Sequence, residues 1–215
     1  MVNNLRPIKL LSAREQVAAV LRKAILSLEI KEGEELTLES VAEQLDVSTT
    51  PVREAFQILA HDGLIKLRPN KGAFVLGINE RTIRDHYETR AILEREAAAM
   101  VCRNNADISE IVASYEQSII ALQEGNAKEY SNYNQAFHMA IWTAAGNEKI
   151  KSLLSSLWNG LSMGHKVTEE AYAKISISEH EKIVEAIKNH DEELSRNLMN
   201  AHIIRSMENI LTHFG

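Results

Sequence analysis

Apolar residues recur every three to four positions along the first part of the chain, which is the spacing of amphipathic helices. The pattern predicts helices over residues 12–28, 38–45 and 49–62. Thr37 is a suitable N-cap for the second of these helices. Residues 30–37 form a polar, glycine-containing break between the first two. This part of the chain is therefore expected to be mainly helical.

Helical spacing stops at Gly63, which is expected to end the third helix. The β-prone segments LIKL and GAFVL follow, joined by the turn residues RPNK, and this order predicts a β-hairpin. Beyond the hairpin the helical pattern returns without a strand pattern, and it predicts six helices over residues 80–103, 107–124, 127–145, 147–164, 174–190 and 191–212. The predicted fold class is mainly α, with three helices and a hairpin followed by an all-α six-helix bundle.

The charge distribution changes at the same place. Residues 1–77 contain ten basic and ten acidic residues, and residues 78–215 contain 14 basic and 20 acidic ones. The second part therefore carries the whole formal charge of −6, which argues against a chain that coats nucleic acid nonspecifically. We predict two domains, residues 1–77 and 78–215.

The single cysteine, Cys102, excludes an internal disulfide framework and suits a reducing compartment. No apolar run approaches the length of about 20 residues that a membrane-spanning helix needs, and the N-terminus lacks the apolar region of a signal peptide. We expect a cytoplasmic protein that does not bind membranes.

The second and third predicted helices are separated by the four residues DVST, a length that suits a helix-turn-helix. In that motif the N-terminal residues of the second helix contact base edges and phosphates in the major groove of double-stranded DNA. The candidate DNA contacts on this helix and at the hairpin tip are Ser48, Thr49, Thr50, Arg53, Arg68, Lys71 and Gly72. Alternatively, Ser48 or Thr49 is an ordinary N-cap and Arg53 a solvated side chain.

Three histidines lie on the apolar stripes of three different helices in the second domain: His138, His180 and His202. Helix bundles build metal sites from such inward-facing side chains. A buried imidazole without a partner costs about 1–3 kcal/mol, and one divalent ion would satisfy all three, with Asn134 offering an oxygen from one turn away. Zinc or nickel fits best, and manganese is a further candidate. Alternatively, each histidine bonds a backbone carbonyl or a carboxylate.

The stretch TLESVAEQLDVSTTPVREAFQILAHDGLIKLRPNKGAFV resembles the winged helix-turn-helix of the GntR family of bacterial transcription regulators. The resemblance implies a homodimer that reads a palindromic operator through the second helix and the wing, which is the hairpin. Thr49 and Glu39 stand where the family commonly has arginine, whereas Arg53 is retained. With fewer cations, phosphate affinity should be weaker or the operator atypical.

The segments RAILE, NQAFH…AAGN, SEHEKIVEAIKNHD and NLMNAHI resemble the ligand-sensing FCD domain of the FadR branch of the family, in its VanR-like six-helix variant. Many members bind a divalent metal through Asp, His, His and His. The histidines fall on His138, His180 and His202, and Asn134 occupies the position of the aspartate. The lost charge should lower metal affinity. The resemblance implies a ligand-responsive regulator of transcription, which we expect to be a repressor.

An open position on such a metal could bind a small organic carboxylate, with Arg90 as a second anion partner. Arg90 could instead pair with Glu94, four residues on along the same helix.

Three other interpretations stay open from the sequence. The metal could be purely structural, or the regulator could have no metal and a different effector. A metal with an open position could also activate water in a hydrolytic enzyme. However, the chain has no HExxH motif, no glycine-rich phosphate loop and no nucleophile constellation.

Overall fold

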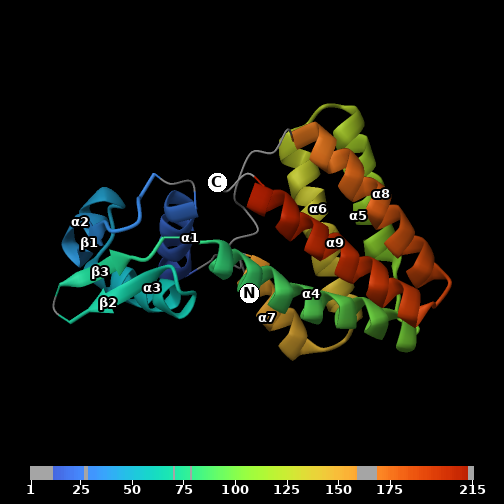
Figure 1. Cartoon of the computed structure of the whole chain (residues 1–215), viewed down its shortest axis with the longest axis horizontal. Coiled ribbons are helices and arrows are strands. Elements are labelled where there is room, and N and C mark those ends of the chain that lie inside the picture. Colours follow the sequence, from blue (N-terminus) through green and yellow to red (C-terminus); the bar gives the residue numbers. More distant parts are fainter. Residues whose placement is uncertain (1–11, 27–28, 70, 78, 159–168, 213–215) are drawn as a thin grey trace, which may run out of the picture. The chain divides into compact units, whose positions relative to one another are not determined.

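The computed structural model describes residues 12–26, 29–69, 71–77, 79–158 and 169–212. The chain divides into two compact units, Met1–Ile78 and Asn79–Gly215 (Figure 1). The mainly helical fold with a small antiparallel sheet in the N-terminal unit confirms the predicted fold class.

The N-terminal unit contains helices α1 (Ala13–Leu26), α2 (Leu38–Gln44) and α3 (Thr49–His61) with strands β1 (Glu35–Leu36), β2 (Ile65–Arg68) and β3 (Gly72–Val75). Helix α1 packs against α3, and fully buried side chains of α3 such as Phe56 and Leu59 form the core with Ile25 of α1. Thr37 caps α2 as predicted, because its hydroxyl accepts a hydrogen bond of 3.1 Å from the backbone N–H of Ser40.

The predicted hairpin is present, since β2 and β3 pair antiparallel with Arg68 opposite Gly72. A third strand was missed, because β1 pairs with the other edge of β3 and the strand order is β1-β3-β2. Only Leu36 of this two-residue strand is buried. Two residues carry no alternating pattern, so the polar break gave no sequence signal for a strand.

Gly72 has a close contact with this additional strand. Its φ is +85°, and a Cβ atom at this position would lie 2.0 Å from the backbone oxygen of Leu36. The position therefore requires glycine for two reasons, the left-handed backbone and the approach of β1. This contact within the sheet is a structural reason for glycine that is independent of the predicted DNA contact.

We expect Gly72→Ala to lower the free energy of unfolding of the N-terminal unit by about 2–4 kcal/mol, measured by urea unfolding and circular dichroism. Gly63→Ala is the matched control, because Gly63 has a φ of +72° but nothing within 4 Å of an added Cβ. Strain alone should cost about 1 kcal/mol there. Equal losses for the two variants would contradict the contact with Leu36.

The C-terminal unit contains helices α4 (Glu80–Arg103), α5 (Ser109–Gln123), α6 (Ala127–Ala144), α7 (Glu148–Trp158), α8 (Glu169–Lys188) and α9 (Glu192–Thr212). Helix α4 lies along α9, α5 lies along α6, and α8 contacts both α5 and α9 (Figure 1). The fully buried side chains of the bundle include Phe137, Ile141, Trp142, Leu154, Ile183 and Ile187.

The predicted bounds agree with these helices to within two residues except at α7 and α8. Residues 159–164, the predicted end of α7, lie outside the described residues. The predicted start of α8 at residue 174 was wrong, because the helix begins at Glu169. Tertiary contacts extend it, since Ala173 is buried against α5 and α6 and the Tyr172 hydroxyl donates to Ser206 Oγ at 3.0 Å.

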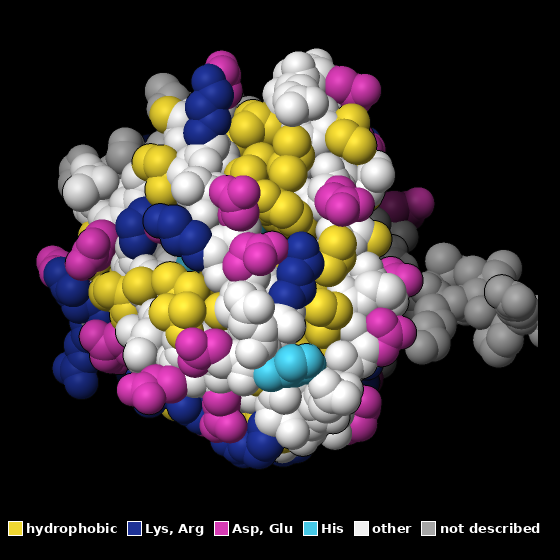
Figure 2. Space-filling model, turned by 90° about the vertical axis from the view of Figure 1, so that its right-hand side faces the viewer, with side chains coloured by type: hydrophobic (Ala, Val, Ile, Leu, Met, Phe, Trp, Pro, Cys, Tyr) yellow, Lys and Arg dark blue, Asp and Glu magenta, His cyan; other side chains and the backbone are white. Residues whose placement is uncertain are grey.

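Apolar, acidic and basic side chains are interspersed on the face of the C-terminal unit drawn in Figure 2. Within the described ranges, no helix is both long enough and apolar enough to cross a membrane.

Candidate functional site

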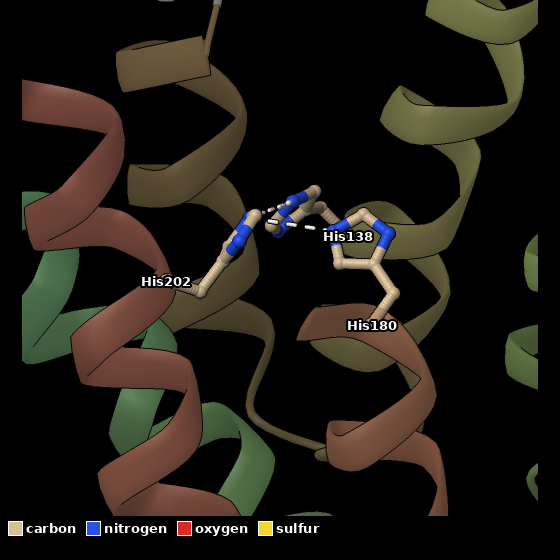
Figure 3. A group of neighbouring side chains, drawn as sticks. All are labelled: His138, His180 and His202. Carbon is tan, nitrogen blue, oxygen red and sulfur yellow. Dashed lines mark hydrogen bonds between the residues drawn. The ribbon is translucent and has the colours of Figure 1, made fainter. Parts of the chain in front are cut away.

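The three histidines meet in the core of the C-terminal unit. His138 projects from α6, His180 from α8 and His202 from α9, and all three are buried. The Nε2 atom of His202 lies 3.3 Å from Nε2 of His138 and 3.3 Å from Nε2 of His180 (Figure 3). One nitrogen from each ring lies within 4.8 Å of the other two. The predicted group of three is therefore brought together.

Two carboxylates hold the far sides of two of these rings. Glu94 Oε2 lies 2.5 Å from His138 Nδ1, and Glu179 Oε2 lies 2.6 Å from His202 Nδ1. Arg90 donates to the other oxygen of Glu94 at 2.5 Å, and Arg205 donates to both oxygens of Glu179. The imidazoles of His138 and His202 are thus each oriented by a glutamate that an arginine holds in place, an arrangement common around metal ligands.

Both glutamates are ionised at neutral pH. Burial would raise the pKa of Glu94, but the charges of Arg90 and His138 lower it to about 2. Burial would likewise raise the pKa of Glu179, but hydrogen bonds from His202 and Arg205 lower it to about 2. An ionised carboxylate only accepts hydrogen bonds, so Nδ1 of His138 and of His202 must carry a proton.

The position of these protons on Nδ1 decides whether the Nε2 atoms of the histidines can bind a metal. A neutral ring with its proton on Nδ1 has a lone pair on Nε2. Burial lowers the pKa of His202 to about 4, against the opposing effect of Glu179, so this ring is neutral at pH 7. Two lone pairs facing each other at 3.3 Å repel unless a cation, a metal ion or a proton, lies between them. Nitrogen ligands at about 2.0–2.1 Å from one tetrahedral zinc ion are about 3.4 Å apart, so the donor set fits a divalent metal.

His180 differs from the other two histidines because it has no carboxylate partner. Its buried Nδ1 has no hydrogen-bond partner among the described residues, and its ring stacks on Phe137 at a centroid distance of 4.1 Å. Burial lowers the pKa of His180 well below the usual value, so the ring is neutral and available as a ligand.

Sequence reasoning missed the role of the two glutamates. The sequence predicts Glu94 only as a partner of Arg90 and predicts no role for Glu179. The only available signal for Glu94 was a carboxylate on a predicted apolar face. Glu179 directly precedes His180 in sequence but reaches His202 of the next helix, so its role depends on how α8 packs against α9.

We expect Glu94→Gln to weaken zinc binding about 10- to 100-fold, because the amide orients His138 without a negative charge. Competition with a chromophoric chelator measures the affinity. Glu96→Gln is the matched control on the same helix, since Glu96 is partly exposed and pairs with Arg196. Unchanged zinc affinity in Glu94→Gln would contradict the orienting role of Glu94.

Arg90 and Asn134 occupy different surroundings. Arg90 is buried, makes the predicted pair with Glu94, and lies over the Trp158 ring at 4.3 Å. The structure thus contains the second of the two arrangements expected for Arg90. Asn134 is half-buried on α6, one turn before His138, and its side chain makes no hydrogen bond within the described part of the chain.

The predicted DNA contacts lie at the start of α3 and around the β2–β3 turn. Ser48 is the N-cap residue of α3, but its side chain makes no capping bond, so its hydroxyl is available to a ligand. Arg53 is exposed and has no ion pair to any described residue, whereas Arg68 forms a salt bridge with Glu35 of β1. The remaining residues, Thr50 and Lys71, are exposed, and Thr49 is half-buried.

A helix pair followed by a hairpin, joined to a separate helical domain, defines a class of transcription regulators. The chain matches the family of bacterial regulatory proteins named gntR over residues 13–75 and the FCD domain over residues 85–205. It belongs to the GntR family, in the group that carries an FCD domain.

Relatives of the chain are regulators of transcription rather than enzymes. The gluconate operon transcriptional repressor of Bacillus licheniformis is 30% identical over 193 residues, which cover 83% of this chain and 77% of the relative. The Nta operon transcriptional regulator of Aminobacter aminovorans is 25% identical, with 86% and 89% covered. The structure of McbR/YncC from Escherichia coli shares the fold, with a TM-score of 0.73 at 23% identity over 96% of this chain and all of that one.

Proposed function

We propose that the protein is a ligand-responsive repressor that binds operator DNA as a homodimer and senses a small organic carboxylate at a metal held by His138, His180 and His202. The observation that carries this proposal is the meeting of three Nε2 atoms, with the opposite ring nitrogens of His138 and His202 fixed by carboxylates. That arrangement directs nitrogen lone pairs toward one position, which is what a divalent cation needs.

The DNA contacts are assigned to the start of α3 and the wing. Ser48 and Thr50 offer exposed hydroxyls and Arg53 offers an unpaired guanidinium, which suits phosphate and guanine recognition in the major groove. Lys71 adds a cation at the turn, and Thr49 and Gly72 supply adjacent backbone. Arg68 contributes less positive charge because Glu35 neutralises it. A homodimer would present two such surfaces to a palindromic operator.

A bound divalent ion, zinc or nickel before manganese, would supply positive charge and open coordination positions for a carboxylate. The chain itself positions the ion, since Glu94 and Glu179 orient two of its ligands and the surrounding core excludes water. Asn134 is one turn away and could add an amide oxygen. The relative named as a gluconate operon repressor supports an organic acid as the class of effector.

The sensing site is connected to the DNA-binding unit along α4. Four residues separate the end of β3 at Val75 from the start of α4 at Glu80, and α4 carries Glu94, which holds His138. A ligand that changes the position of His138 therefore acts on the helix that continues from the wing. Different affinities of the effector for the DNA-bound and free forms would couple the two sites.

The test uses the full chain, loaded with zinc or stripped with a chelator, and a duplex selected by the protein from a random library. We expect organic carboxylates to change DNA affinity only in the zinc-loaded form, measured by fluorescence anisotropy. A structural ion predicts that zinc raises stability while no carboxylate alters stability or DNA binding. Absence of zinc, nickel and manganese binding in equilibrium dialysis would overturn the metal proposal.

A further inference from the structure

One charged side chain is buried in the core of the N-terminal unit, and it is not among the proposed DNA contacts. Arg22 of α1 is 6% exposed, and it is the one buried charged residue among those that the structure describes before residue 78. Ala18 and Ile25, which share its face of α1, are apolar and buried. A buried guanidinium is costly unless it is paired, so the partner of Arg22 indicates what the residue does.

The partner of Arg22 is Asp62, the residue at which α3 ends. Nη2 of Arg22 donates to Oδ2 of Asp62 at 2.5 Å, and the two side chains are 7% and 22% exposed. Asp62 is the C-cap residue of α3, so the guanidinium also places a positive charge where the helix dipole favours one. The pair therefore connects α1 to the end of the helix whose first turn carries the proposed DNA contacts.

Asp62 also lies at the junction between α3 and the wing. The next residue, Gly63, has a φ of +72°, and β2 begins two residues after it. The backbone N–H of Leu64 donates to a carbonyl of α3 at 3.0 Å, and the carbonyl of Leu64 accepts from the N–H of Leu76, just after β3, also at 3.0 Å. The end of α3, the start of β2 and the end of β3 are thus joined beside the ion pair.

Stability alone is a weak reason for a buried ion pair. Replacing such a pair by apolar residues is often neutral or stabilising, because the desolvation of two charges cancels much of their attraction. In addition, Nε of Arg22 is buried and has no hydrogen-bond partner among the described residues, so the guanidinium is not fully satisfied. An ion pair adds direction, since the guanidinium donates along fixed N–H bonds. The pair therefore suits a role in orientation more than a role in stability.

We infer that Arg22 and Asp62 are positioning residues for DNA recognition, because their buried ion pair holds α3 and the wing at one relative angle. This inference rests on the proposed DNA contacts of α3 and the wing. Specific binding requires both elements to meet the duplex in register, whereas nonspecific binding to phosphates depends mainly on charge. Loss of the pair should therefore lower specific affinity more than nonspecific affinity.

The double variant Arg22→Met/Asp62→Leu tests this inference in the full chain, because it removes the pair without changing the net charge or leaving one charge unpaired. We expect its melting temperature, measured by scanning calorimetry, to fall by no more than about 5 °C. Its affinity for the duplex selected by the wild type should fall about 10-fold or more. Its affinity for a scrambled duplex, measured by fluorescence anisotropy over a range of salt concentrations, should stay within about twofold.

Two single variants complete the test. Asp62→Leu leaves a buried guanidinium without its partner, so it should lower the melting temperature by about 10 °C or more. Arg14→Met is the matched control, because Arg14 of α1 also pairs with an acidic residue of α3, Glu54. That pair has a distance of 3.9 Å, and both side chains are about half exposed. Arg14→Met should change neither the melting temperature nor the ratio of specific to nonspecific affinity.

The outcomes distinguish this inference from the proposed function. If the double variant keeps its specific affinity, or loses specific and nonspecific affinity equally, the pair does not position α3 and the wing, and the proposed DNA contacts survive. A melting temperature of the double variant as low as that of Asp62→Leu would assign the pair to stability instead. If the wild type itself selects no duplex from the library, the proposed function fails, and this inference fails with it.

Discussion

Replacing Arg53 by alanine is expected to weaken binding to the selected duplex about 10- to 100-fold and to remove the band shift in a gel assay. Arg53 is exposed on α3 and has no ion pair among the residues described, so its loss leaves the fold intact. A bidentate contact of arginine to guanine contributes about 1–3 kcal/mol of discrimination. Fluorescence anisotropy at fixed salt measures the affinity.

Arg53→Lys separates the two possible contacts of this side chain. Lysine keeps a phosphate contact and its salt dependence but lacks the planar fork that reads guanine. Weak binding with a retained salt slope would indicate base reading. Arg81→Ala is the control for lost charge, since Arg81 is 90% exposed on α4. Wild-type affinity of Arg53→Ala would refute the placement of α3 in the groove.

His202→Ala is expected to reduce bound zinc from about one ion per chain to nearly none. His202 is the central histidine of the three, because its Nε2 lies 3.3 Å from that of each other histidine. At a zinc concentration of about 1,000 times Kd, the stabilisation lost is about 4 kcal/mol. Metal analysis after dialysis and the zinc-dependent change in Tm measure both effects.

The comparison is made between zinc-loaded and stripped forms of one variant, because alanine also removes the partner of Glu179. His190→Asn is the matched control. His190 is exposed, lies away from the apolar stripe and has a φ of +53°, which asparagine tolerates. It should retain zinc and the full change in Tm. Zinc retained by His202→Ala would show that the ion binds elsewhere.

Helical periodicity predicted most of the fold because long amphipathic helices repeat the same signal over several turns. The same signal located the three histidines, since each lies on a stripe of apolar residues that must face the core. The short strand β1 and the first turns of α8 were missed, because contacts with β3, α5, α6 and α9 stabilise them more than any local pattern. A single sequence does not display such contacts.

The surroundings of the histidines were less predictable than the histidines themselves. Glu179 lies in the sequence beside His180 yet binds His202, and Glu94 of α4 binds His138 of α6. Both contacts depend on how these helices pack against one another. The pairing of Arg90 with Glu94 was local, at i and i+4, and was therefore one of two foreseeable outcomes.

Helix α4 links the histidine site to the segment that leads into the wing through a single long helix. The helix runs without a break from Glu80 to Arg103. Glu94, which contacts His138, lies fourteen residues after Glu80. At 1.5 Å per residue that distance is about 21 Å. A rigid helix that pivots by about 5° at Glu94 therefore moves its first turn by about 2 Å, on this lever arm. A tilt of α4 about its contact with His138 is therefore felt most at the segment that leads into the wing.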